Sequence, residues 1–189
     1  IVGRMSEFLS AHGRRLIGWD EIIEGGLAES AAVMSWRGES GGLTAAAAGH
    51  DVVMAPVGFT YLDLLEARDL DKEPVAQGGY LPLDRVYEYE PIPAELSPDK
   101  AHHVLGTQAQ LWTEYMPTPD QVEYMAFPRL SALAEVAWSD RGRRHYDEFV
   151  DREFGKKKAV PHGISWFWWV IAIVLLVVMT GVWAIFFRH

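Results

Sequence analysis

Residues 31–56 read AAVMSWRGESGGLTAAAAGHDVVMAP, in which two apolar runs flank a cluster of alanines. The runs Ala31–Trp36 and His50–Pro56 are apolar almost throughout, which is typical of strands that are covered on both faces. Between them, Thr44–Ala48 predicts a helix, and Gly49 is placed to end that helix as a C-terminal cap. A strand, a helix and a second strand in succession indicate a parallel β/α unit.

The same alternation continues on both sides of this unit. Leu16–Trp19 is a short apolar run after a predicted helix over Met5–His12, and Val104–Trp112 is a fourth run before a predicted helix over Asp120–Trp138. Pro128 should kink that last helix or split it in two. We therefore predict an α/β fold with half of a β/α barrel, whose four parallel strands lie near residues 15–20, 31–36, 50–56 and 104–112.

The charge distribution separates an acidic body from a basic tail. Residues 1–155 carry all 26 acidic and 13 of the 17 basic residues, a net charge of −13, whereas the remaining residues carry four basic residues and no acid. A body this acidic, with no basic groove, argues against a nucleic-acid partner. The absence of cysteine excludes a disulfide scaffold, a thiolate zinc site and a cysteine nucleophile, and the seven histidines lack zinc-site spacing. We expect no metal and no cofactor.

The tail contains a candidate transmembrane helix. Residues 164–187 read ISWFWWVIAIVLLVVMTGVWAIFF, which is 24 residues without a charge. As a helix they would extend about 36 Å, enough to cross a hydrocarbon core of about 30 Å, with tryptophans near both ends as in interfacial belts. The basic cluster Lys156–Lys158 precedes the segment and, by the positive-inside rule, favours a cytoplasmic location for its N-terminal side.

Polar and aromatic residues stand where the predicted strands give way to loops. In a β/α barrel the active site is built from these C-terminal strand ends. Flat indole rings suit the apolar faces of a pyranose, and carboxylates at the rim suit its hydroxyl groups, so the combination indicates a sugar-binding pocket. For any single tryptophan, core packing is the alternative. The candidate site residues are Trp19, Trp36, Tyr61, Asp63, Trp112 and Glu114.

Seven segments occur in a characteristic order along the chain: GWDEIIEGGL, AVMSWRG, GHDVVMAP, TYLD, GGYLPLDRVYEYEP, LGTQAQLWTEYM and VEYMAFPRLSALAEVAWS. Together they resemble the C-terminal half of the catalytic barrel of family 20 glycoside hydrolases, the β-N-acetylhexosaminidases. The resemblance covers residues 1 to about 150 and implies a partial (β/α)8 TIM barrel made of about the last four β/α units. It also implies an exo-acting enzyme whose partners are glycans or chitooligosaccharides that end in N-acetylglucosamine or N-acetylgalactosamine.

The resemblance assigns a role to each candidate residue. The family uses a substrate-assisted route, in which the acetamido oxygen of the substrate attacks the anomeric carbon. Carried over by motif, the three tryptophans would line the pocket for the acetamido group and the sugar ring. Tyr61 would donate a hydrogen bond to the acetamido oxygen and fix it for attack. Asp63 and Glu114 would accept hydrogen bonds from ring hydroxyls such as those at positions 4 and 6.

The family's general acid is missing from this sequence. That acid is the glutamate of an Asp-Glu pair in an H-x-G-G-D-E motif at the end of the fourth strand, and no such motif occurs here. The dipeptide Asp20-Glu21 follows the fifth strand's tryptophan in the family pattern and is not the acid. We therefore expect the catalytic pair to lie upstream of Ile1, and the 189-residue chain alone to be inactive.

The expected organisation is residues 1–150 as the C-terminal half of the barrel, 151–163 as a basic linker and 164–187 as a helix in the lipid bilayer. That helix is not part of the family pattern. We expect a membrane-associated protein with a periplasmic or extracellular catalytic parent, although the lysine cluster favours the cytoplasm. Two alternatives stay open. One is a catalytically inactive, membrane-tethered half-barrel that binds sugar weakly or not at all, and the other is a chain whose functional part is the helix.

Overall fold

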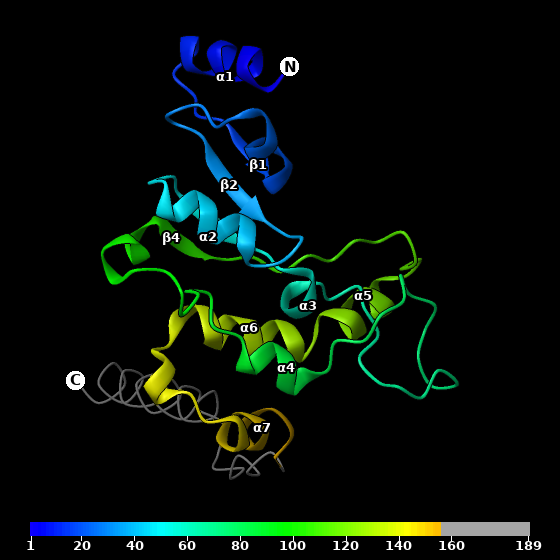
Figure 1. The fold of residues 1–189 in the computed structure, drawn as a ribbon. Coiled ribbons are helices and arrows are strands. Elements are labelled where there is room, and N and C mark those ends of the chain that lie inside the picture. Colours follow the sequence, from blue (N-terminus) through cyan, green and yellow to red (C-terminus); the bar gives the residue numbers. More distant parts are fainter. Residues whose placement is uncertain (156–189) are drawn as a thin grey trace, which may run out of the picture. The chain divides into compact units, whose positions relative to one another are not determined.

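The computed structural model describes residues 1–155 (Figure 1). The predicted transmembrane helix over residues 164–187 and most of the linker before it lie outside the described residues. Within residues 1–155, no helix is long and apolar enough to cross a membrane. The chain divides into two compact units, Ile1–Phe149 and Val150–His189, and the sheet and all candidate site residues belong to the first unit.

Four short parallel strands form one sheet whose strand order equals the chain order, β1-β2-β3-β4. Ile17 lies opposite Ala32, Val33 opposite Val52, and Val52 opposite Val104. The prediction of an α/β fold with a parallel sheet is therefore confirmed. The elements are, in chain order, α1 (Val2–Ala11), β1 (Ile17–Trp19), the 3-10 helix η1 (Asp20–Gly25), β2 (Ala32–Ser35), α2 (Ser40–Ala47), β3 (Val52–Met54), α3 (Val57–Thr60), α4 (Leu83–Glu88), η2 (Pro98–His103), β4 (Val104–Thr107), α5 (Pro119–Ala126), α6 (Arg129–Trp138), η3 (Arg141–Arg143) and α7 (Tyr146–Phe154).

Helix α2 packs closely on β2 and β3 because its contact residues are small. A Cβ atom at Gly42 would collide with the Met54 sulfur, and Ala45 and Ala46 are fully buried. The helix begins at Ser40, earlier than the alanine cluster predicted, and ends before Gly49, whose φ of 90° suits glycine. Gly42, Ala45 and Ala46 are the buried residues of α2 and thus mark the face that covers the sheet.

Strand β4 is shorter than predicted because it loses its partner where β3 ends. Strand β4 stops at Thr107 instead of continuing to Trp112. Farther along, Gln110 pairs in parallel with Tyr61, with backbone hydrogen bonds of 2.9 and 2.8 Å to the residues on either side of that tyrosine. This second pairing brings the segments that carry Tyr61 and Trp112 together beyond the end of the sheet.

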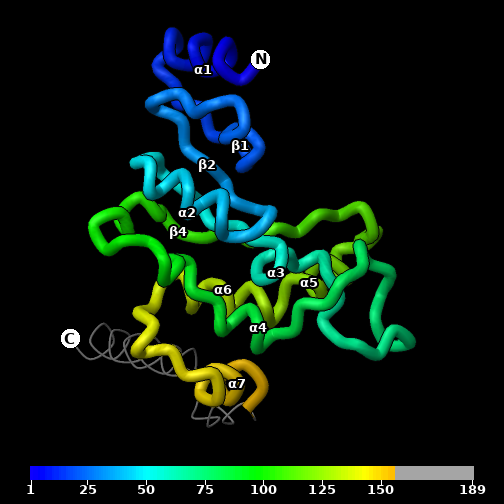
Figure 2. Tube along the Cα trace, in the orientation of Figure 1, coloured from blue at the N-terminus to red at the C-terminus, as the bar shows by residue number. Residues whose placement is uncertain are grey.

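Pro128 splits the helix predicted over residues 120–138 into α5 and α6, as the sequence indicated. Helices α3 and α4 were not predicted, because they have only four and six residues and no repeating apolar pattern. Figure 2 shows the long connection between these two helices extending to the side of the chain where α5 lies. Gln121 of α5 donates a hydrogen bond to the Val75 carbonyl of this connection at 3.1 Å.

Candidate active site

All six candidate residues line one pocket of about 470 Å³ at the carboxyl ends of the strands. A volume of this size lies within the range of small-molecule sites. Most of its lining is aromatic or acidic, which suits a ligand with apolar faces and hydroxyl groups. The other lining residues, which the sequence analysis did not assign to the pocket, are Glu21, Val57, Leu64 and Gln77.

Three of the four strand ends contribute a tryptophan to this pocket. Trp19 is the last residue of β1, Trp36 follows β2 directly, and Trp112 lies shortly after β4. Parallel strands bring such residues together because their carboxyl ends share one edge of the sheet. The Trp36 and Tyr61 rings are 6.3 Å apart between centroids and tilted by 33°. Trp112 is 47% exposed, so much of its indole is accessible in the pocket.

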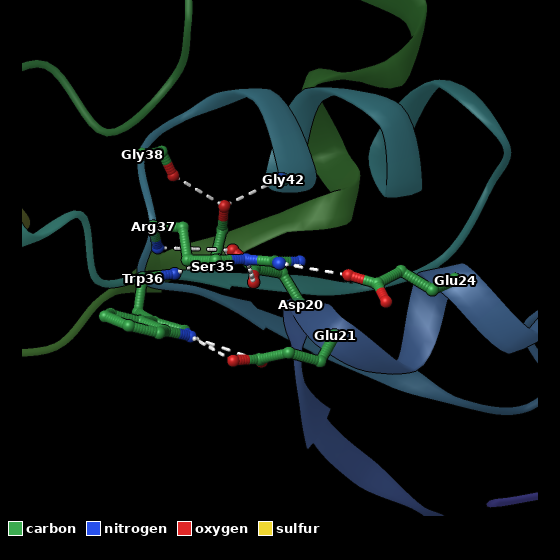
Figure 3. Close-up of polar contacts among 8 residues, drawn as sticks. All are labelled: Asp20, Glu21, Glu24, Ser35, Trp36, Arg37, Gly38 and Gly42. Carbon is green, nitrogen blue, oxygen red and sulfur yellow. Dashed lines mark hydrogen bonds and ion pairs between the residues drawn. The ribbon is translucent and has the colours of Figure 1, made fainter.

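The Asp20-Glu21 dipeptide binds the loop that follows β2 (Figure 3). Asp20 is 2% exposed, and its Oδ2 accepts hydrogen bonds from the backbone N–H groups of Trp36 and Arg37 at 3.2 and 3.3 Å. Its Oδ1 accepts from Arg37 Nε at 2.6 Å. Both carboxylate oxygens of Glu21 lie near the Trp36 indole nitrogen, at 3.0 and 3.2 Å. Both carboxylates are thus engaged in fixing this loop.

The same loop is also fixed to helix α2 (Figure 3). The Ser35 hydroxyl donates to the Gly38 carbonyl at 2.7 Å and accepts from the Gly42 N–H at 2.8 Å. A Cβ atom at Gly41 would lie 2.8 Å from the Asp20 Cβ, so only glycine lets the helix approach this closely. The position of Trp36 therefore depends on η1, β2 and the start of α2 together.

Tyr61 is buried and presents a neutral hydroxyl group. It is 8% exposed, and burial raises the pKa of its phenol above the ordinary value. A hydrogen bond with Trp112 lowers that pKa in part, and the negative charge of Asp63 raises it. At neutral pH the hydroxyl therefore keeps its proton and is available as a hydrogen-bond donor.

Asp63 offers an acceptor that the described residues leave unused. It is 4% exposed, and its Oδ1 has no hydrogen-bond partner within residues 1–155. Burial raises the pKa of this carboxyl, its own backbone N–H lowers it, Glu114 raises it and Arg129 lowers it. A buried polar atom without a partner costs free energy, so a ligand hydroxyl at this position would remove a penalty. Glu114 is exposed at the rim of the same pocket.

Arg129 supports the pocket backbone, and the sequence analysis missed it. Its side chain is fully buried, and its guanidinium donates to four backbone carbonyls, two of which flank Asp63. The acceptors are Leu64 (2.8 Å) and Leu81 (3.0 Å) for Nη1, and Leu62 and Met125 (both 2.8 Å) for Nη2. The sequence feature that could have indicated this role is one arginine directly after Pro128, in a helix whose next residues are mostly apolar.

Among residues 1–155, no histidine lines the pocket. His103 instead lies 3.3 Å from an oxygen of Asp51, whose other oxygen accepts from Arg15 at 2.7 Å. The Arg15 and His103 contacts lower the pKa of the Asp51 carboxyl. In the part of the chain that the structure describes, no group of three or more histidine, aspartate or glutamate side chains could hold a metal ion.

Comparisons with known proteins identify the family to which the chain is similar. The model of the glycosyl hydrolase family 20 catalytic domain matches residues 1–141. A beta-hexosaminidase of Porphyromonas gingivalis is 51% identical over 152 residues, which are 80% of this chain and 19% of that protein. The family 20 β-N-acetylhexosaminidase of Streptomyces coelicolor has a TM-score of 0.71 at 30% identity, covering 82% of this chain and 32% of that one. The family 20 exo-β-N-acetylglucosaminidase of Vibrio harveyi, solved with N-acetylglucosamine, has a TM-score of 0.70 at 34% identity, covering 79% and 24%.

This chain belongs to glycosyl hydrolase family 20 and carries part of the family's catalytic domain. Its α/β fold matches the barrel structures of that family. The chain spans 19% of the Porphyromonas relative and 32% and 24% of the two solved structures.

Proposed function

We propose that this chain is the C-terminal part of the catalytic barrel of an exo-acting β-N-acetylhexosaminidase. Its substrates would be glycans or chitooligosaccharides that end in N-acetylglucosamine or N-acetylgalactosamine. The observation that carries the proposal is the unpartnered Oδ1 of buried Asp63 in a pocket lined by three tryptophans. Aromatic faces beside an unused acceptor suit a pyranose ring with its hydroxyl groups.

The reaction would use the substrate's own acetamido group. Its oxygen attacks the anomeric carbon while the bond from that carbon to the leaving oxygen breaks, and a general acid protonates the leaving oxygen. In this proposal the Tyr61 hydroxyl donates a hydrogen bond to the acetamido oxygen and holds it in position. Asp63 and Glu114 accept hydrogen bonds from ring hydroxyls, and the three tryptophans line the space around the ring and the acetamido group.

The remaining catalytic parts would come from a segment upstream of Ile1. An Asp-Glu pair there would supply the general acid and orient the acetamido group. The rest of the barrel would pair with β1 and β4, the edge strands of the described sheet. Ile17 and Leu105 on these strands are 55% and 57% exposed, as expected of apolar residues that further strands would cover. Residues 1–150 would then form about the last four β/α units.

We also propose that residues 164–187 anchor the protein in a lipid bilayer, and that residues 151–163 form the basic linker between this anchor and the barrel. The support is 24 residues without a charge between basic flanks. The catalytic part would lie in the periplasm or outside the cell, although the lysine cluster before the segment favours the cytoplasm. Fractionation of cells that express the complete protein with and without residues 156–189 tests this, because the shortened protein should leave the membrane fraction.

An assay of the complete protein that contains this chain tests the enzymatic proposal. It should release the aryl alcohol from an aryl N-acetylglucosaminide, whereas the 189-residue chain alone should not, because the acid is worth about 10²–10⁴-fold. Glu21→Gln in the short chain should make no difference. Robust activity of the short chain that Glu21→Gln abolishes would contradict the assignment of the acid to an upstream segment. An inactive complete protein would favour the alternative of a non-catalytic half-barrel.

A further inference from the structure

We propose that Glu21 is a positioning residue that sets the orientation of the Trp36 indole in the pocket. Glu21 lies in η1, directly after β1, and is itself a lining residue. Both of its carboxylate oxygens face the indole nitrogen of Trp36, at 3.0 and 3.2 Å (Figure 3). A carboxylate that accepts one N–H with both oxygens forms a charge-assisted hydrogen bond, which is stronger than one between neutral groups.

The neighbouring Asp20 makes this contact effective. Because Asp20 accepts from the backbone N–H groups of Trp36 and Arg37, the main chain at this tryptophan is already fixed. Only the two side-chain torsions of Trp36 then remain free. A second attachment at the indole nitrogen restricts both torsions, since the nitrogen lies far from the Cα atom on the ring. Asp20 therefore fixes the backbone at Trp36, and Glu21 fixes its ring.

The orientation of this ring matters to the pocket because Tyr61 is its neighbour. The two ring centroids are 6.3 Å apart, and both residues line the same pocket. An indole free to rotate would change the space beside the Tyr61 hydroxyl and would have to be ordered when a ligand binds. Ordering one side chain costs affinity by about 3- to 10-fold. Glu21 therefore acts through Trp36 without touching reacting atoms.

Three variants of the complete protein isolate this role. Glu21→Met removes both acceptors while keeping a side chain of similar length, and Glu21→Gln keeps one carbonyl acceptor. Glu24→Met is the matched control, because Glu24 lies on the same 3-10 helix, is 70% exposed and pairs with Arg37 at 3.0 Å. Glu21 is exposed, so Glu21→Met should unfold at the same temperature as the wild type.

The first measurement needs no catalysis. In protein labelled with ¹⁵N at tryptophan, the indole resonance of Trp36 is the one that disappears in Trp36→Phe. Glu21→Met should move this resonance to the position of a water-exposed indole, Glu21→Gln should move it less, and Glu24→Met should leave it in place. An unchanged Trp36 resonance in Glu21→Met would overturn the proposal.

The second measurement rests on the proposed function. Glu21→Met should raise the KM for an aryl N-acetylglucosaminide, and the inhibition constant of N-acetylglucosamine, by about 3- to 10-fold. Adding Glu21→Met to Trp36→Phe should change neither value, because phenylalanine has no indole N–H. An equal loss in both backgrounds would show that Glu21 does not act through Trp36. A wild-type protein without activity would contradict the proposed function alone, and the indole resonance would still decide on Glu21.

Discussion

The guanidinium of Arg129 fixes the backbone on both sides of Asp63. It donates to the carbonyls of Leu62 and Leu64, at 2.8 Å each, from a side chain that is fully buried. A carboxylate oxygen of Glu66 lies 3.9 Å from its Nε, beyond hydrogen-bonding distance. A residue of α6 therefore determines where a loop of the pocket lies, although it is not among the residues that line the pocket.

Replacing this arginine should strongly destabilise the folded protein. Arg129→Met would leave four carbonyls without their donor, three of them in buried hydrogen bonds, and each unsatisfied buried group costs about 1–3 kcal/mol. We expect the free energy of unfolding of the complete protein to fall by about 3 kcal/mol or more, as measured by chemical denaturation. The exposed Arg143→Met is the control and should change it by less than about 0.5 kcal/mol. Equal stability of the two variants would contradict this account of Arg129.

Two glycine-to-alanine changes should act in opposite directions. Gly41→Ala would place a Cβ 2.8 Å from the Asp20 Cβ, so α2 or Asp20 must move, at a cost of about 1–3 kcal/mol. Gly3→Ala in α1 has no atom within 4 Å of the new Cβ and should stabilise its helix by about 0.5–1 kcal/mol. Thermal unfolding separates the two. A neutral Gly41→Ala would mean that the contact with Asp20 adjusts without loss.

The substitution Asp63→Asn should raise the stability of the folded protein and weaken its binding of ligand. The pKa of Asp63 is raised in the folded protein, mainly by burial, so the folded state binds the proton more tightly than the unfolded chain, whose ordinary value is 3.8. Below that value both states are protonated and burial costs little. As the pH rises through the folded pKa, the wild type loses stability and Asp63→Asn does not. The stability gained by Asp63→Asn should therefore be larger at about pH 7 than at about pH 3.

The same Asp63→Asn variant should bind N-acetylglucosamine more weakly, because an amide accepts a hydroxyl hydrogen bond less strongly than a carboxylate does. Calorimetric titration at neutral pH measures this. Glu88→Gln is a control on the exposed side of α4, outside this pocket, and should leave the affinity unchanged. Unaltered affinity in Asp63→Asn would remove Asp63 from the proposed binding residues.

Tyr61→Phe should lower kcat more than it raises KM in the complete enzyme. Its hydroxyl is proposed to hold the acetamido oxygen as it attacks, an interaction that matters most in the transition state. Steady-state kinetics with an aryl N-acetylglucosaminide gives both constants. An unchanged kcat with only a raised KM would assign the hydroxyl to substrate binding instead.

The sequence predicted the parallel sheet and the residues that meet at its edge, because both follow from local patterns. Apolar runs such as Ala31–Trp36 identify strands, and the residue after each run lies at a known end of the sheet. All six candidate residues could therefore be placed around one pocket from the sequence. Their individual roles come from the family resemblance and stay predictions.

The contacts that cross between distant segments could not be predicted. Arg129 binds carbonyls some 65 residues away, and nothing local in its helix indicates those partners. The pairing of Gln110 with Tyr61 could not be predicted either, because it joins distant segments and depends on where β3 ends. Glu21 was interpreted only as part of a dipeptide that is not the acid, and its contact with Trp36 required the register of β1 and β2.

The sequential order of the strands has a consequence for the timing of assembly on the ribosome. Strands β1, β2 and β3 all lie before residue 55, so they can pair while the rest of the chain is still being made. Strand β4 begins only at Val104, and Trp112 and Arg129 follow it. The pocket is therefore completed only after β4 and the segments that follow it have been made. A nascent chain that pauses between residues 55 and 103 would expose the free edge of β3, and a chaperone that protects it should bind during that interval.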